Sequence, residues 1–94
     1  MPTILNDLYT TILDRKANPQ PGSYTASLFA AGSAEIAKKV GEEAIEVVLA
    51  AAAQSDQRLV EEAADLIYHL LVALAQRGVT LEQVEAELEA RRRQ

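Results

Sequence analysis

The sequence contains neither cysteine nor tryptophan, and aromatic residues make up only 4% of it. Without cysteine the protein has no disulfide framework and no thiolate zinc site, and nothing in it requires an oxidising compartment. Residues 1–15 lack the basic segment and apolar core of a signal peptide, and no stretch approaches the roughly 20 apolar residues of a membrane span. We therefore expect a cytoplasmic protein that does not associate with membranes.

Basic residues are also scarce. The 94 residues include 9 Lys and Arg against 14 Asp and Glu, which gives a formal net charge of −5. Because nucleic-acid phosphates are bound by clustered Lys and Arg, we expect no nucleic-acid partner. The length suits a single domain, 1–94, and a domain of this size buries only roughly 60–70% of its unfolded surface. Its apolar faces are therefore expected to need a partner subunit.

Apolar residues recur with a period near 3.6, and no strand pattern is present, so we predict an all-α helical bundle. Ser33 is the predicted N-cap of a long helix, and Gly32 is predicted as a left-handed residue that closes the preceding helical turn. Gly78 is predicted to end the second long helix, and Thr80 with Gln83 forms a capping-box pattern. A Pro- and Gly-containing loop is expected at 17–23. The predicted helices are 3–15, a short turn at 25–31, 33–54, 57–77, and one from 80 to the C-terminus.

The two long helices carry acidic residues beside their apolar faces. A link of only Ser55 and Asp56 makes the helices antiparallel neighbours, and these helices form the centre of the predicted bundle. On helical wheels Glu43 and Glu46 border the apolar face of the 33–54 helix, and Glu62 and Asp65 share a polar seam on the 57–77 helix. Four carboxylates are therefore expected to converge.

Such a cluster needs a cation, because two negative charges about 4 Å apart repel by roughly 4 kcal/mol at an effective dielectric near 20. Oxygen ligands without cysteine favour Mg²⁺, with Mn²⁺ as a second possibility. A single E-x-x-E pair is an ordinary pattern of a solvated helix surface. Two acidic pairs on adjacent helices favour a metal site over that interpretation.

Three strings of the sequence occur together in one known family. They are KKVGEEAIE at 38–46, EEAADLIYHL at 61–70, and Ser23-Tyr24-Thr25 upstream. In this combination the chain resembles the phosphoribosyl-ATP pyrophosphohydrolase family of the all-α nucleotide pyrophosphohydrolase superfamily, over nearly its whole length. The resemblance implies Mg²⁺-dependent hydrolysis of phosphoribosyl-ATP to phosphoribosyl-AMP and pyrophosphate, the second step of histidine biosynthesis, in a helical homo-oligomer.

The resemblance also implies roles for individual acids. Glu43, Glu46, Glu62 and Asp65 take the metal-ligand positions, and these are the same four residues that the helical wheels bring together. A carboxylate that the metal does not fully engage, Glu42 or Glu46, is the expected base that takes a proton from water.

Five further residues are candidates for binding the substrate. Lys38 and Lys39 lie one helical turn before the acids and can reach phosphate. The alternative is i,i+4 pairing with Glu42 and Glu43, which explains Lys39 equally well. Ser23, Tyr24 and Thr25 match residues of the family's substrate loop; alternatively they only end a loop.

Four other residues stand out on the long helices or at their start. Glu35 stands where many relatives are expected to carry a basic residue, which argues against a phosphate contact there. Gly41 is explained by close helix packing. His69 is expected to hydrogen-bond a metal-ligating carboxylate from outside the site, and Tyr68 to lie in the core or an interface.

Three alternatives remain beside this interpretation. The same acids would serve a house-cleaning hydrolase of dUTP, dCTP or other nucleoside triphosphates. A noncatalytic helical dimerisation module would use the acids only for salt bridges to Lys38, Lys39 or Arg58. A di-iron bundle is disfavoured, because it needs two Glu-x-x-His motifs and the chain has one His.

In each of the two long helices several sides are apolar. We therefore expect a homodimer in which these two helices pack against the same helices of a second copy.

Overall fold

The computed structural model describes residues 3–93, and these residues form helices and connecting segments without any strand. The predicted all-α fold is confirmed. The first helix runs two residues past its predicted end, because the breakers begin only at Asn18 and Pro19. The helices are α1 (Ile4–Ala17), α2 (Tyr24–Ala31), α3 (Ser33–Ala53), α4 (Asp56–Arg77) and α5 (Leu81–Arg92).

Local capping explains most helix ends. The predicted capping box of α5 is confirmed, since the Thr80 side chain accepts from the Gln83 backbone N–H and the Gln83 side chain accepts from the Thr80 N–H. Ser55 caps α4 by accepting from the backbone N–H of Arg58. Gly78 ends α4, as predicted, and its φ of 71° lies in the left-handed region.

The junction between α2 and α3 differs from its prediction. Ser33 is the first residue of α3 rather than its N-cap; Gly32 takes the cap position, where no side chain accepts a hydrogen bond. Gly32 has φ 98° and ψ 175°, so its φ is positive but it is not in the left-handed helical conformation that we predicted. One glycine thus serves both helices, which leaves no space for a separate serine cap.

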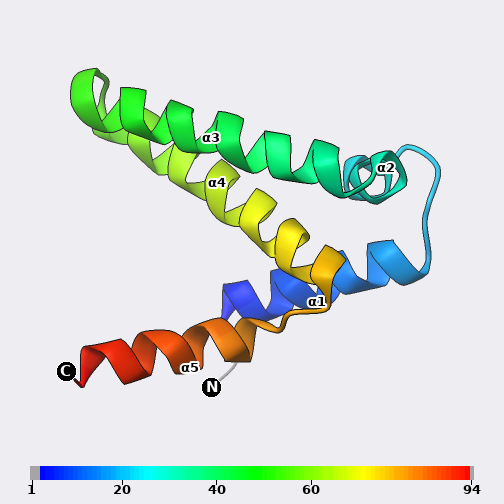
Figure 1. Cartoon of the computed structure of the whole chain (residues 1–94). Coiled ribbons are helices and arrows are strands. Elements are labelled where there is room, and N and C mark those ends of the chain that lie inside the picture. Colours follow the sequence, from blue (N-terminus) through cyan, green and yellow to red (C-terminus); the bar gives the residue numbers. More distant parts are fainter. Residues whose placement is uncertain (1–2, 94) are drawn as a thin grey trace.

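The hydrophobic core lies where α1, α2 and the beginning of α3 meet the C-terminal half of α4. Figure 1 shows α1 beside the end of α4 and α2 at the start of α3. Leu81 brings the first turn of α5 into the same core, while the rest of α5 extends away from it (Figure 1). The buried members are Tyr9, Ile12, Leu28, Ile36, Leu71, Val72, Ala75 and Leu81.

The α3–α4 hairpin projects from this core. The chain doubles back at Gln54 and Ser55, and the two helices pack against each other beyond the reach of α1 and α2 (Figure 1). Toward the tip, large aliphatic side chains stay exposed: Val48 is 64% and Val60 is 62% exposed. The hairpin therefore presents apolar surface that this chain alone does not cover.

None of the helices described between residues 3 and 93 combines the length and the apolar composition needed to cross a membrane.

Candidate functional site

Three carboxylates meet on the α3–α4 hairpin. Glu43 of α3 and Glu62 and Asp65 of α4 each offer an oxygen atom, and these atoms lie within 4.8 Å of one another. Glu62 is only 5% exposed, Glu43 is half-buried, and Asp65 is exposed. The convergence of these three side chains agrees with the helical wheels, because the short link holds the two polar seams face to face.

Glu46, the fourth acid of the predicted ligand set, is not part of this group. Its side chain is exposed one turn beyond Glu43. Glu42 is also exposed, and one of its carboxylate oxygens lies 3.8 Å from the Lys39 ammonium nitrogen. The roles of Glu42 and Glu46 as base, and of Glu46 as ligand, stay predictions.

Arg58 supplies the positive charge closest to the buried acid. Its guanidinium donates hydrogen bonds to Glu62 and to the exposed Glu61. The pKa of Glu61 is lowered by the hydrogen bond from Gln57 and then by Arg58. The noncatalytic dimerisation module was expected to use salt bridges from the acids to Lys38, Lys39 or Arg58, and one of these, Arg58–Glu62, is present.

Arg58 does not neutralise the whole group. Glu43, Glu62 and Asp65 together carry three negative charges, so two remain even when Arg58 is counted entirely toward them. Within residues 3–93, Glu43 and Asp65 make no ion pair of their own. A divalent cation with a preference for oxygen ligands fits both this charge and this set of donors.

Lys38 and Lys39 lie one turn before the acids but pair differently from our expectation. The Lys38 ammonium nitrogen lies 4.0 Å from Glu35, which precedes it, and Lys39 pairs with Glu42 at i,i+3 rather than i,i+4. The pKa of Lys39 is raised, chiefly by the neighbouring Tyr24 and further by Glu42 and Glu43. The Lys39 side chain is 28% exposed against 62% for Lys38, so Lys39 is the less exposed of the two lysines.

The three residues that open α2 have separate roles. The Ser23 hydroxyl caps the helix by accepting from the Ala26 backbone N–H. The Tyr24 hydroxyl lies 3.1 Å from Nε2 of His69, and the Thr25 hydroxyl is hydrogen-bonded to the Tyr68 hydroxyl. Tyr24 and Thr25 therefore connect α2 to α4, whereas Ser23 stabilises α2 itself.

Two predictions for the long helices need correction. His69 is buried, but its Nδ1 lies 2.7 Å from the backbone carbonyl of Asp65, not from a carboxylate. A Cβ atom at Gly41 would meet no neighbouring atom within 4 Å in residues 3–93, so close packing inside this chain does not explain that glycine. Tyr68 packs against the core, as predicted.

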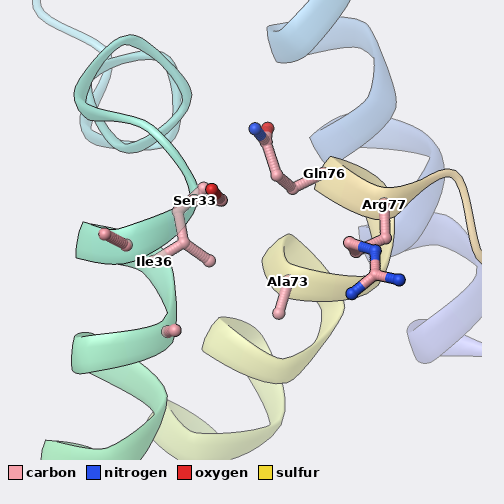
Figure 2. Close-up of a pocket in the computed structure, with 7 residues that line it drawn as sticks. Ser33, Ile36, Ala73, Gln76 and Arg77 are labelled. Carbon is pink, nitrogen blue, oxygen red and sulfur yellow. The ribbon is translucent and has the colours of Figure 1, made fainter.

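A separate pocket of about 390 Å³ lies between the first turn of α3 and the last turns of α4. Figure 2 shows Ser33 and Ile36 on one side of it and Ala73, Gln76 and Arg77 on the other. Ala73 is two helical turns beyond Asp65, so the pocket is distinct from the three carboxylates. Sequence analysis did not identify this pocket, because no motif marks it.

Two contacts near the site, the specific pairing of Arg58 with Glu62 and the bond between Tyr24 and His69, were not predicted from the sequence. The i,i+4 spacing of Arg58 and Glu62 is a signal that could have shown Arg58 as the partner of this acid in particular. No local signal connects Tyr24 to His69, since their contact depends on where the loop places α2.

Comparison with known proteins gives consistent results. A family model described as phosphoribosyl-ATP pyrophosphohydrolase matches residues 5–92. Proteins named phosphoribosyl-ATP pyrophosphatase are 54% identical over 88 residues in Listeria welshimeri (94% of this chain, 84% of the relative) and 55% identical over 89 residues in Pelotomaculum thermopropionicum (95% and 91%). One from Saccharolobus islandicus is 48% identical over 90 residues, 96% of each chain. The chain therefore belongs to the phosphoribosyl-ATP pyrophosphohydrolase family and is a hydrolase.

Proposed function

We propose that this protein catalyses the Mg²⁺-dependent hydrolysis of phosphoribosyl-ATP to phosphoribosyl-AMP and pyrophosphate, as the second step of histidine biosynthesis in the cytoplasm. The observation that carries the proposal is the meeting of Glu43, Glu62 and Asp65 on the hairpin of a chain that matches this family over residues 5–92. The names of its relatives support the substrate.

The three carboxylates are the residues that would hold the metal, with Glu46 as a fourth ligand after a change of side-chain conformation. When bound, Mg²⁺ supplies positive charge for the phosphate oxygens and makes water more acidic. Mn²⁺ has the same preference for oxygen ligands and could replace it.

The remaining residues of the site handle the proton and the phosphates. Glu42 or Glu46 takes a proton from the attacking water, whose oxygen forms the new bond to phosphorus as the bridging P–O bond breaks. Lys38 and Lys39 offset the negative charge of the phosphates. Tyr24 and Thr25 contribute hydroxyl groups to substrate binding, and Ser23 stabilises the start of α2 through its cap hydrogen bond.

Turnover on a panel of substrates tests the proposal. The purified protein is assayed for pyrophosphate release from phosphoribosyl-ATP, dUTP and dCTP, each with Mg²⁺. We expect phosphoribosyl-ATP to have the highest kcat/KM. A preference for a simple deoxynucleoside triphosphate would favour the house-cleaning alternative and overturn the substrate.

Thermal melts with and without Mg²⁺ test the metal. A ligand that binds only the folded state raises the melting midpoint, so we expect Mg²⁺ to raise it. An unchanged midpoint together with no turnover on any substrate would favour the noncatalytic helical module.

We also propose that the protein is a homodimer formed through the α3–α4 hairpin. The support is the exposed aliphatic surface near the tip, where Ile45 is 61% and Val48 is 64% exposed. A domain of this size gains stability when a partner covers such a surface.

A further inference from the structure

We propose that Arg58 is a phosphate-binding residue of the site: held by Glu61 and Glu62, its guanidinium donates hydrogen bonds to a phosphate group of the substrate beside the three carboxylates. The inference rests on the proposed function, because it assigns a role within the same site. It goes beyond the salt bridge already described, which uses only part of the hydrogen-bonding capacity of this side chain.

Arg58 lies on the same face of α4 as the two acids that this helix contributes to the cluster. Residues 58, 62 and 65 are spaced i, i+4 and i+7, which places their side chains in one row along a helix. Residue 58 is one turn nearer than residue 62 to the point where the hairpin doubles back, at Gln54 and Ser55. Arg58 therefore borders the carboxylates on the side of the hairpin tip.

Hydrogen bonds to two acids hold the guanidinium there and leave donors free. Nη1 donates to Glu61 at 2.5 Å, and Nη2 donates to Glu62. A guanidinium carries five N–H groups, and the other three have no acceptor within residues 3–93. Because the oxygen atoms of an ionised phosphate only accept hydrogen bonds, these free N–H groups are the complement that a phosphate requires.

Arg58 is open to a ligand, whereas the acid that anchors it is not. The Arg58 side chain is 48% exposed, and the Glu62 side chain is 7% exposed. Since the shielded carboxylate fixes one side of the pair, the guanidinium is held in place without being covered. An arginine that is ordered before the ligand arrives loses less conformational freedom on binding it than a free side chain does.

The charge of the site also favours a cation at this place. Three carboxylates keep one negative charge after one Mg²⁺ has bound, and a polyphosphate adds more. Arg58 brings the charge of the site to zero before the substrate arrives. Lys38 and Lys39 pair with Glu35 and Glu42 instead, so within residues 3–93 Arg58 is the cation that forms an ion pair with a member of the cluster.

A purely structural role for Arg58 predicts a different behaviour. In that case the guanidinium only neutralises the shielded Glu62, and its loss would disturb the position of a metal ligand. The affinities for Mg²⁺ and for phosphate would then fall together. A phosphate-binding role separates them, because the metal keeps all of its carboxylates while the phosphate loses a donor.

The test compares the binding of Mg²⁺ with the binding of pyrophosphate. Kd is measured by calorimetry for Mg²⁺ alone, and for pyrophosphate at saturating Mg²⁺, in the wild type, Arg58→Gln and Arg58→Lys. Loss of hydrogen bonds between charged groups predicts a rise of roughly tenfold or more in the pyrophosphate Kd of Arg58→Gln, and in its KM for phosphoribosyl-ATP. Its Kd for Mg²⁺ should be no higher than that of the wild type, since no guanidinium competes for Glu62.

Two further variants separate this role from folding. Arg58→Lys keeps a positive charge for Glu62, so we expect a melting midpoint near that of the wild type. Lysine lacks the planar fork that contacts two acids and a phosphate together, so its pyrophosphate Kd should lie between those of the wild type and Arg58→Gln. Arg91→Gln is the matched control, because Arg91 also pairs with an acid four residues away, Glu87, but on α5. Its Kd values and KM should be unchanged.

The outcomes distinguish this inference from the proposed function. A wild-type pyrophosphate Kd in folded Arg58→Gln, Kd values for Mg²⁺ and pyrophosphate that rise by the same factor, or no binding of pyrophosphate by the wild type would each overturn the role of Arg58. If Arg58→Gln does not fold, an unchanged pyrophosphate Kd in Arg58→Lys overturns it. If the wild type does not hydrolyse phosphoribosyl-ATP but Arg58→Gln loses affinity for pyrophosphate alone, the role of Arg58 is supported and the substrate is wrong.

Discussion

At the scale of single residues, the site combines a buried acid with exposed ones. Glu62 is shielded from water and paired with Arg58, while Asp65 is open to solvent on the same helix. A buried carboxylate keeps its place because it cannot reorient into water without losing its partner, so it gives the site a fixed point. The exposed acids can then adjust around an incoming ion.

Neutral amides at the acid cluster provide the first prediction. Glu43→Gln and Asp65→Asn should each lower turnover by roughly a hundredfold or more, because a lost ligand removes several kcal/mol of transition-state stabilisation. Without metal, their melting midpoints should equal or exceed that of the wild type, since each change removes a repelling charge. Activity assays and melts check this, and retained turnover in both variants would refute their assignment as ligands.

The second prediction concerns Arg58 as a competitor for the metal. Arg58→Gln should lower the melting midpoint of the metal-free protein, because Glu62 loses its ionic partner. The rise in midpoint on adding Mg²⁺ should be larger than in the wild type, since no guanidinium then competes for the carboxylate. Arg91→Gln is a control, as Arg91 pairs with Glu87 on the exposed surface of α5 and with no other acid among residues 3–93. An equal Mg²⁺ response in Arg58→Gln and wild type would show that Arg58 does not compete.

The residues that sequence analysis could place are those whose neighbours are fixed locally. Glu43, Glu62 and Asp65 were predictable because a short link aligns two regular helices. The bond between His69 and Tyr24 was not, since it depends on how the core positions α2 against α4. Side-chain rotamers also lie outside helical-wheel arguments, which is why the wheel included Glu46 in the cluster.

At the scale of helices, the ends are encoded by short motifs and the packing by distant contacts. The Thr80–Gln83 box and Gly78 were predictable from a few consecutive residues. The α2–α3 junction was not, because Gly32 accommodates both helices with a backbone conformation that a serine cap would not require. The Tyr9 hydroxyl of α1 donates a hydrogen bond to the Val79 carbonyl, 2.5 Å away in the segment after α4. No sequence pattern predicts this bond.

The third prediction tests the cap of α5. Thr80→Ala should destabilise the protein by about 1 kcal/mol, because a backbone N–H of the first turn loses its acceptor. Thr80→Ser keeps the hydroxyl and should be close to wild type. Urea denaturation measures both, and equal stability of the alanine and serine variants would exclude a contribution from the cap.

The fourth prediction concerns how the stability contributed by Tyr9 depends on pH. Burial, and secondarily Glu82, raises the pKa of Tyr9 above its ordinary value of 10.0. The stabilisation linked to this shift is complete below pH 10 and is lost as the pH rises through the folded-state pKa, because the unfolded chain releases its proton first. Tyr9→Phe should therefore be less stable near neutral pH, by about 1 kcal/mol for the lost hydrogen bond, yet lose less stability between pH 8 and 11. Melts across that range check this, and parallel pH curves for variant and wild type would contradict it.

At the scale of the whole molecule, the core and the site occupy different parts of the fold. The core lies where α1 and α2 cover the open end of the hairpin (Figure 1). Residues 43, 62 and 65, which carry the three carboxylates, are closer to the turn at Gln54 and Ser55. Toward the tip Ile45, Val48, Leu49 and Val60 are exposed, and on the core side of Asp65 the α4 residues Ile67 and Leu70 are exposed as well. An isolated hairpin tip of this composition gains free energy when a second apolar surface covers it.

The fifth prediction is that a single charge on this surface separates the homodimer. Val48→Glu places a carboxylate on a side chain that is 64% exposed in the single chain and would be buried between subunits. Burying an unpaired charge costs far more than leaving it in water, so the variant should sediment as a monomer while the wild type sediments as a dimer. Because the apolar surface of each subunit would then be exposed to water, the melting midpoint of the variant should fall below that of the wild type. It should also depend less on protein concentration.

The control for this prediction places the same charge elsewhere. Leu13→Glu changes a leucine of α1 that is 41% exposed and is not part of the α3–α4 hairpin, so sedimentation should be unchanged. A wild type that remains monomeric at micromolar concentrations would contradict the dimer outright. If instead both variants are dimeric, the interface lies on another surface, and the aliphatic tip of the hairpin would need a different partner to explain its exposure.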